Sequence, residues 1–155
     1  MKGKPEVIEV LAKMLKEELG AISQYFIHAE MCENWGYGKL SDHTKKESIN
    51  EMKHAEKLIE RLLYLDAHPI VSNYNEMHIG AAVADMHKND LDAEIDAVKA
   101  YNESIRVCVE AGDEGTKELL ESILSDEEDH VDWLEAQLMQ IEQMGLEVYL
   151  AEQIG

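Results

Sequence analysis

Apolar side chains recur every three or four residues through four long segments of the chain, which is the period of an amphipathic α-helix. Pro5 suits the first turn of the first helix, and Ser41 is placed to cap the second. Glycines and prolines mark the ends of the segments. The pattern predicts helices over residues 5–35, 41–65, 83–111 and 116–145, followed by a short fifth helix within residues 146–154.

The connections between these segments differ in length. The first two helices and the last two are joined by short turns, which favour antiparallel neighbours, whereas residues 68–80 break the helical pattern and form one long connection. A connection of this length fits a crossover that runs the length of a bundle. The sequence therefore predicts an all-α fold, a four-helix bundle with one long crossover, formed as a single domain by residues 1–155.

The charge and the cysteine content reduce the number of possible functions and partners. The chain of 155 residues carries 33 acidic and 14 basic side chains, a net charge of −19 that disfavours nucleic acid and anionic membranes and favours cations. No apolar stretch approaches the roughly 20 residues of a membrane span. Two isolated cysteines, Cys32 and Cys108, suit a reducing compartment. We therefore expect a cytoplasmic protein that binds neither nucleic acid nor membrane.

Six ionisable residues interrupt the apolar stripes in a repeated pattern. A glutamate in the first and third helices is followed 33 residues later by a Glu-x-x-His motif in the next helix, which places both motif side chains on one helix face. Tyrosines lie seven residues after the first glutamate of each pair, at Tyr25 and Tyr101. The two hairpins thus resemble two copies of one half-site, made by Glu18, Glu51 and His54, and by Glu94, Glu127 and His130.

Burial of these six side chains requires a compensating charge. Four carboxylates and two imidazoles in a bundle core are costly if they are ionised and unpaired, and two divalent cations would neutralise them. A lone Glu-x-x-His motif usually lies on a solvent-exposed helix face and binds no metal. Two such motifs in register with two matching glutamates indicate a metal site instead. One Glu from each of two helices plus Glu-x-x-His from the other two is a di-metal carboxylate arrangement. Oxygen and imidazole ligands without thiolate suit iron or manganese, or zinc without redox chemistry.

The whole chain resembles the bacterioferritins, the haem-containing branch of the ferritin family. The resemblance rests on QYFIHAEM, ENWG, ESINEMKHAEKLIERLLYL, DEEDHVDWLE and MGLEVYLAEQI, which occur in order and with their spacing intact. It implies that the six residues are ferroxidase ligands, with Glu51 and Glu127 bridging two irons. It also implies a hollow twenty-four-subunit cage, built from two-fold dimers, that oxidises Fe(II) with O2 or H2O2 and stores the Fe(III) mineral.

Three further residues are candidates for redox roles. Tyr25 and Trp133 are candidate one-electron donors near the centre, and both are equally well explained as core aromatics. Met52 lies beside Glu51 but on another helix face, so it is expected to point away from the interior. By resemblance, Met52 is the axial ligand of a haem b shared by two subunits across a two-fold axis, and the haem passes electrons inward from a ferredoxin-type partner to release iron.

Two positions depart from the family pattern, and two other functions remain open. Lys46 and Asn50 stand where some relatives have His and Asp, so an accessory iron site on the inner cage wall is expected to be absent, and a mixed cage with a second subunit type is an alternative. The other functions are a rubrerythrin-like peroxide reductase without storage and a structural or electron-transfer haem dimer. The first usually carries a segment with paired cysteines, which the residues after Asp126 lack.

Overall fold

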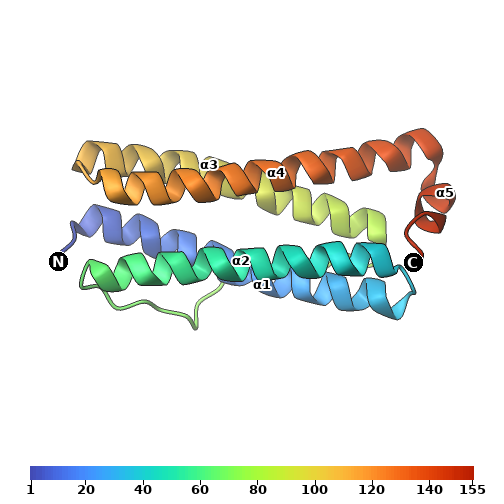
Figure 1. Ribbon diagram of the computed structural model, residues 1–155, viewed down its shortest axis with the longest axis horizontal. Helices are drawn as coiled ribbons and strands as arrows, with labels where there is room; N and C mark the ends of the chain where they lie inside the picture. The colour runs from blue at the N-terminus through green and yellow to red at the C-terminus, as the bar shows by residue number, and fades with distance from the viewer.

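The computed structural model describes residues 1–155 and contains helices but no strands. Four long helices lie side by side along one axis, and a short fifth helix turns across one end (Figure 1). This arrangement confirms the predicted all-α bundle. The helices are α1 (Pro5–Asn34), α2 (Gly38–Tyr64), α3 (Val83–Ala111), α4 (Glu114–Met144) and α5 (Leu146–Ala151). None of them combines the length and apolarity that a membrane crossing requires.

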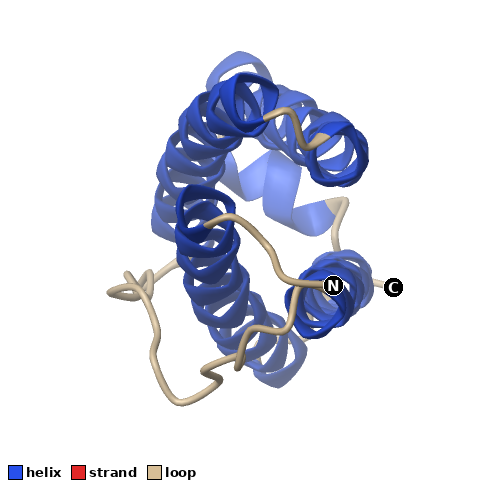
Figure 2. Ribbon diagram, turned by 90° about the vertical axis from the view of Figure 1, so that its left-hand side faces the viewer, coloured by secondary structure: helices blue, strands red, loops and turns tan.

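The bundle consists of two antiparallel hairpins. The helix α1 packs mainly against α2, and α3 packs mainly against α4, while the contact between α1 and α3 joins the two hairpins. The view along the bundle shows the long helices around a common centre, with α5 lying across the far end (Figure 2). Each short turn contains a glycine with a positive φ, Gly36 at +84° and Gly112 at +72°, a backbone conformation that favours glycine.

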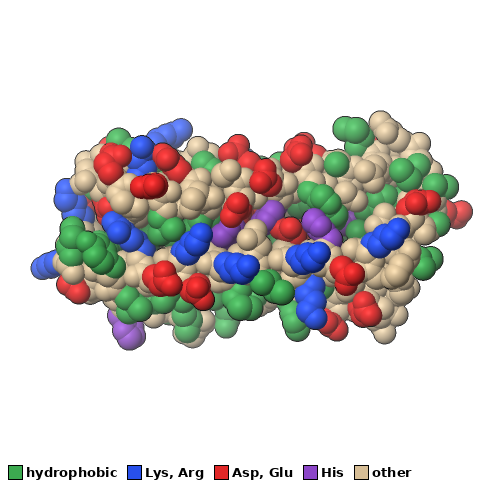
Figure 3. Space-filling view, in the orientation of Figure 1, with side chains coloured by type: hydrophobic (Ala, Val, Ile, Leu, Met, Phe, Trp, Pro, Cys, Tyr) green, Lys and Arg blue, Asp and Glu red, His purple; other side chains and the backbone are tan.

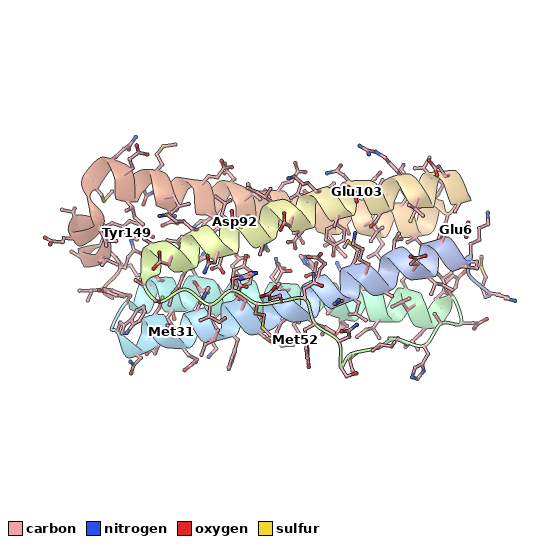
Figure 4. All side chains as sticks on the ribbon, turned by 180° about the vertical axis from the view of Figure 1, so that it is seen from behind. Glu6, Met31, Met52, Asp92, Glu103 and Tyr149 are labelled. Carbon is pink, nitrogen blue, oxygen red and sulfur yellow. The ribbon has the colours of Figure 1, made fainter.

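The predicted crossover is confirmed and runs along the outside of α1 (Figure 4). Two backbone N–H groups attach it there: that of His78 donates to Gln24 Oε1 and that of Gly80 donates to His28 Nε2, each at 3.0 Å. The ring of His28 is fixed on its other side by Asp90 of α3, whose carboxylate lies 2.9 Å from Nδ1. The crossover is therefore anchored to buried polar side chains of the first hairpin.

Two helix starts differ from the sequence prediction. The helix α2 begins at Gly38 after Tyr37, which makes no side-chain cap, so Ser41 lies inside the helix and is not its N-cap. The helix α4 begins at Glu114, two residues before the predicted Thr116. The Asp113 carboxylate accepts the backbone N–H of Thr116 at 3.0 Å and its hydroxyl at 2.7 Å, so Asp113 is the true cap.

The apolar core is divided into two parts by a polar layer. The larger cluster fills the end of the bundle that holds the N-terminus and includes Leu11, Leu58 and Leu120. The smaller cluster lies at the other end and includes Cys32, Leu40, Val83, Met86 and Tyr149 of α5. The six glutamate and histidine side chains occupy helix positions between these two clusters. Apolar packing on both sides thus holds the polar layer in place and keeps it away from bulk water.

Candidate metal centre

The structure brings the six predicted side chains together at the middle of the bundle. Each is at most 7% exposed, although each is ionisable. The helix period explains the convergence, because each side chain lies on the face of its helix that carries the buried stripe. One glutamate comes from each of α1 and α3, and a Glu-x-x-His pair comes from each of α2 and α4: Glu18, Glu94, Glu51 with His54, and Glu127 with His130.

Their ligand atoms form two overlapping groups that share two carboxylates. In each group the oxygens and nitrogens that face a metal all lie within 4.8 Å of one another. The shared residues are Glu51 and Glu127, the two that the resemblance to the bacterioferritins implies as bridging. The remaining members are Glu18 and His54 in one group and Glu94 and His130 in the other. The sharing is what a pair of adjacent cations requires.

The two histidines face the centre in equivalent ways. His54 Nδ1 lies 3.0 Å from Glu127 and 3.5 Å from Glu18, while His130 Nδ1 lies 3.0 Å from Glu51 and 3.2 Å from Glu94. The two rings are roughly parallel, with centroids 6.4 Å apart. Each ring therefore directs its Nδ1 atom inward and its Nε2 atom outward.

Several of these buried atoms have no hydrogen-bond partner. They are Glu18 Oε2, Glu51 Oε1, His54 Nδ1, Glu94 Oε2 and Glu127 Oε1. A buried polar atom without a hydrogen-bond partner costs about 1–3 kcal/mol. The contacts of His54 Nδ1 with Glu127 and of His130 Nδ1 with Glu51, each at 3.0 Å, offset part of this cost but leave four buried carboxylates facing only two histidines. Oxygen and imidazole donors in this number are suited to divalent iron, manganese or zinc. The donor set and its unpartnered atoms thus fit a pair of divalent cations.

The pKa values of these groups show that protons occupy the site when metal does not. Burial and the charge of Glu51 raise the pKa of Glu18 and Glu127 well above the usual carboxyl value. Burial alone would lower the pKa of His54, but the nearby carboxylates of Glu18 and Glu51 raise it to about 11. Burial would likewise raise the pKa of Glu51, yet hydrogen bonds from its neighbours lower it. Cations entering the site must therefore displace protons.

Two tyrosines connect the hairpins through this centre. The hydroxyl of Tyr25 in α1 donates to Glu94 of α3, and that of Tyr101 in α3 donates to Glu18 of α1. Burial raises the pKa of both tyrosines well above the ordinary value, so both hydroxyls keep their protons. Tyr25 thus lies in direct contact with a candidate ligand, as expected of a candidate donor. Tyr101 occupies the equivalent place on the other hairpin.

Trp133 lies beside the centre but not among the six side chains. It lines the same small cavity as Tyr25 and His130. Its ring stacks on that of His43, with centroids 3.7 Å apart, and the ring of His87 meets it edge-on at 5.7 Å. The two histidines around Trp133 follow no ligand spacing, so this contact could not be predicted from the sequence.

Met52 points away from the bundle interior, as the sequence predicts. Its side chain is 54% exposed, and it lies on the edge of α2 that is away from α3 and α4 (Figure 4). Ile49, one turn earlier in α2, and Phe26 of α1 are also exposed. The space-filling view shows hydrophobic side chains along this lower edge of the molecule (Figure 3). Met52 therefore lies in an apolar surface rather than in the candidate metal centre.

Three residues contact the outer nitrogens of the two histidines, and the sequence analysis named only Asn50 among them, for a different reason. Asp126 Oδ2 lies 2.8 Å from His54 Nε2, and Asn50 Nδ2 lies 3.0 Å from His130 Nε2. The Glu47 carboxylate also contacts His130 Nε2. Position offers a signal in two cases, since Asn50 and Asp126 each directly precede a shared glutamate. Histidine side chains are visible in the groove between α2 and α4 (Figure 3).

A cavity of about 620 Å³ opens from the centre towards the surface between α1 and α3. Its wall includes Glu18 and Glu94, each of which has one carboxylate oxygen without a hydrogen-bond partner, and four acidic residues outside the centre: Glu17, Glu76, Asp92 and Asp96. Lys99 is the only lysine or arginine in its wall. The negative potential of such a wall concentrates cations near the centre.

Known proteins match the chain over nearly its whole length. A family model described as the ferritin-like domain matches residues 8–144. A bacterioferritin of Rhodobacter capsulatus is 42% identical over 145 residues, which is 94% of this chain and 90% of the relative. A bacterioferritin of Mycolicibacterium paratuberculosis is 40% identical over 152 residues, 98% of this chain and 96% of the relative. The fold, the paired Glu-x-x-His motifs and these matches together place the chain in the bacterioferritin branch of the ferritin family.

Proposed function

We propose that this chain is the subunit of an iron-storage cage and that each subunit is a ferroxidase. The observation that carries the proposal is the pair of overlapping four-residue groups, several of whose buried ligand atoms make no hydrogen bond and would be satisfied by two cations. The ligands are Glu18, Glu51, His54, Glu94, Glu127 and His130, carried by one ferritin-like domain over residues 1–155.

Two Fe(II) ions are the substrate of the reaction. Each gives up one electron, and the pair reduces one O2 to H2O2 with two protons, or one H2O2 to two waters with two protons. Glu51 and Glu127 contact both positions, so their negative charge stabilises the rise in positive charge as both ions become Fe(III). The histidines keep the two positions apart by fixing one ligand nitrogen at each.

Tyr25 and Trp133 are proposed as one-electron donors to the centre. Tyr25 hydrogen-bonds to Glu94, and Trp133 shares a small cavity with His130. Either side chain would supply an electron when fewer than two Fe(II) ions are available to reduce the oxidant. Their aromatic rings are also part of the packing around the centre, which is why a spectroscopic signal of an oxidised ring, rather than loss of stability, is the relevant test.

Met52 is proposed as the axial ligand of a haem b shared by two subunits. An exposed thioether on an apolar surface fits this role, because a two-fold axis presents the same residue twice, once from each subunit. The haem would supply a route for electrons, from a ferredoxin-type protein, to reduce the stored mineral and release Fe(II).

The assembly is proposed to be a twenty-four-subunit cage built from two-fold dimers, with either one subunit type or two. Exposed apolar residues on α1, α2 and the crossover provide surface for self-association, among them Phe26, Ile49, Met52, Ile70, Val71 and Tyr74. The absence of an accessory inner-wall iron site at Lys46 and Asn50 and a cytoplasmic location stay predictions from the sequence. Both cysteines are buried and free, consistent with a reducing compartment.

Ferrous loading of the assembled protein tests this proposal. Stopped-flow absorbance should show rapid Fe(II) oxidation in the parent and a large loss of rate in Glu18→Ala and in His130→Ala. Exposed Glu103→Ala is the matched control and should behave as the parent. If both site variants oxidise and mineralise iron as fast as the parent, the site assignment is wrong.

Three measurements separate this function from the two alternatives. A cage-sized particle that retains oxidised iron supports storage, whereas a dimer that oxidises iron and releases it supports a peroxide reductase. A protein that binds haem, shown by its visible spectrum, but does not oxidise Fe(II) supports a structural or electron-transfer role. Met52→Leu should remove the haem spectrum without changing the rate of Fe(II) oxidation.

A further inference from the structure

The two half-sites are related by a constant sequence offset. Each glutamate, tyrosine and histidine of the first half-site has a residue of the same type 76 positions later in the second. The pairs are Glu18 and Glu94, Tyr25 and Tyr101, Glu51 and Glu127, and His54 and His130. Their contacts are equivalent too, since each tyrosine donates to the glutamate of the opposite hairpin. Beside the histidines, the equivalent residues Asn50 on α2 and Asp126 on α4 differ in charge.

Asp126 gives His54 a carboxylate on its outer side. Its Oδ2 atom lies 2.8 Å from His54 Nε2, so it accepts the Nε2–H hydrogen and leaves the Nδ1 lone pair directed at the centre. A carboxylate in this position fixes the tautomer and orientation of a ligand histidine and makes it more basic. His54 is therefore prepared on its outer side for binding metal through Nδ1.

Asn50 cannot do the same for His130. The Asn50 atom that lies 3.0 Å from Nε2 is the amide nitrogen Nδ2, which can only donate a hydrogen bond and so neither accepts an Nε2–H hydrogen nor adds a negative charge. Glu47, one helix turn before Glu51, supplies the missing carboxylate, because its buried Oε2 atom lies in direct contact with His130 Nε2 and has no other hydrogen-bond partner. The position equivalent to Glu47 in the other hairpin is apolar Ile123. The acidic partner is thus an aspartate directly before the shared glutamate on α4, but a glutamate one helix turn before the shared glutamate on α2.

We infer that Glu47 is the positioning residue of His130, in the role that Asp126 plays for His54, and that Glu47 sets the metal affinity of the His130 subsite. The inference rests on the proposed function in taking both histidines as metal ligands. The Glu47 side chain is 19% exposed and that of Asp126 is 47% exposed. A less hydrated carboxylate acts more strongly on its histidine, so removing the charge of Glu47 has the larger effect.

Titration of the metal-free assembled protein with Co(II) tests the inference without iron oxidation. The parent is expected to bind two Co(II) per subunit, followed by calorimetry and by the visible absorption of bound Co(II). In Glu47→Gln, one of the two binding steps should weaken about 10–100-fold while the other changes less than about twofold. In Asp126→Asn the other step should weaken, by a smaller factor. Exposed Glu56→Gln on the same helix should match the parent.

A second variant separates positioning from packing. In Glu47→Gln/Asn50→Asp, the carboxylate returns to the place equivalent to Asp126, so the weakened step should recover to within about threefold of the parent and the Co(II) spectrum should be restored. Equal weakening of both steps in Glu47→Gln, parent-like affinity in that variant, or no recovery in the double variant would each overturn the inference. A parent that binds no Co(II) at this centre would instead contradict the proposed function.

Discussion

The hairpin α1–α2 and the hairpin α3–α4 are alike at the bundle centre and different at its ends. At the centre, glutamates, tyrosines and histidines 76 residues apart make equivalent contacts. The turn glycines Gly36 and Gly112 share the same offset, but most other features outside the centre do not match. Towards the ends, buried Leu11 of α1 corresponds to buried His87 of α3, and the former packs among apolar residues of the large core cluster while the latter contacts Tyr149 of α5. A pair of cations requires equivalent side chains in the two hairpins only at the positions where the cations bind.

The caps of the second helices show the same divergence. Asp113 caps α4 through Thr116, whereas the equivalent Tyr37 provides no side-chain cap for α2. Helix ends can be stabilised in several ways, by a cap, by neighbouring packing or by water, so they vary without cost to the centre. The 76-residue repeat in this chain is therefore clearest at the candidate metal centre and does not extend through the whole hairpin.

The largest expected effect comes from the glutamates that belong to both groups. Glu51→Gln and Glu127→Gln should each weaken binding of both Co(II) ions by more than about 100-fold, because a ligand matters more than its outer partner. Glu94→Gln should weaken mainly one. Calorimetric titration of the metal-free protein measures both steps. If Glu51→Gln weakens one step only, the two half-sites do not share this carboxylate.

Proton release is the next effect in size. The raised pKa values of Glu18 and Glu127, and that of His54 at about 11, mean that the empty centre holds protons at neutral pH. Metal binding must release them, so affinity should rise with pH, by about tenfold per pH unit for each proton displaced.

Calorimetry in buffers of different protonation enthalpy counts the protons released. His54→Ala should release fewer than the parent, because it removes one of the groups that hold a proton. If the affinity for Co(II) does not change between about pH 6 and 8, the empty centre does not hold protons that the metal must displace.

His87 tests the divergent end of the second hairpin. Burial, helped by nearby His28, lowers the pKa of His87 to about 4 from about 6.5 in an unfolded chain. Its neutral form therefore stabilises the fold above about pH 6.5, and this contribution is lost as pH falls towards 4. Between pH 7 and pH 5 the loss should be about 2 kcal/mol.

The variant His87→Leu introduces the residue type found at the equivalent Leu11. Thermal unfolding of the metal-free protein at the two pH values should show a smaller pH dependence in this variant than in the parent. An unchanged pH dependence would show that His87 is already protonated, or exposed, in the folded protein.

The smallest effect is expected from the two tyrosines. Tyr25→Phe and Tyr101→Phe each remove one hydrogen bond between the hairpins and should lower the free energy of unfolding of the metal-free protein by about 1 kcal/mol. Half-exposed Tyr74→Phe is the control. Equal losses in the two site variants support equivalence of the hairpins, and a loss in one alone breaks it. Denaturant titration measures all three.

The sequence by itself determined the helices, their order and the convergence of the six candidate ligands. These features follow from local periodicity, because a helix places residues three, four and seven apart on one face whatever packs against it. The outward direction of Met52 followed from the same rule. The predicted start of α2 was wrong. Ser41 is a good N-cap by residue type, but the helix begins three residues earlier, at Gly38.

Tertiary structure alone decided the contacts between helices. Nothing in the spacing of Glu47 or His43 indicates that they meet His130 and Trp133, and the place of Asp126 beside Glu127 does not show which histidine it meets. Each contact depends on the rotation and height of one helix relative to another. The same is true of the crossover, which is fixed by Gln24 and His28 from 50 or more residues away. Periodicity acts within one helix and sets which side chains are buried, whereas packing between helices sets which of the buried groups become partners.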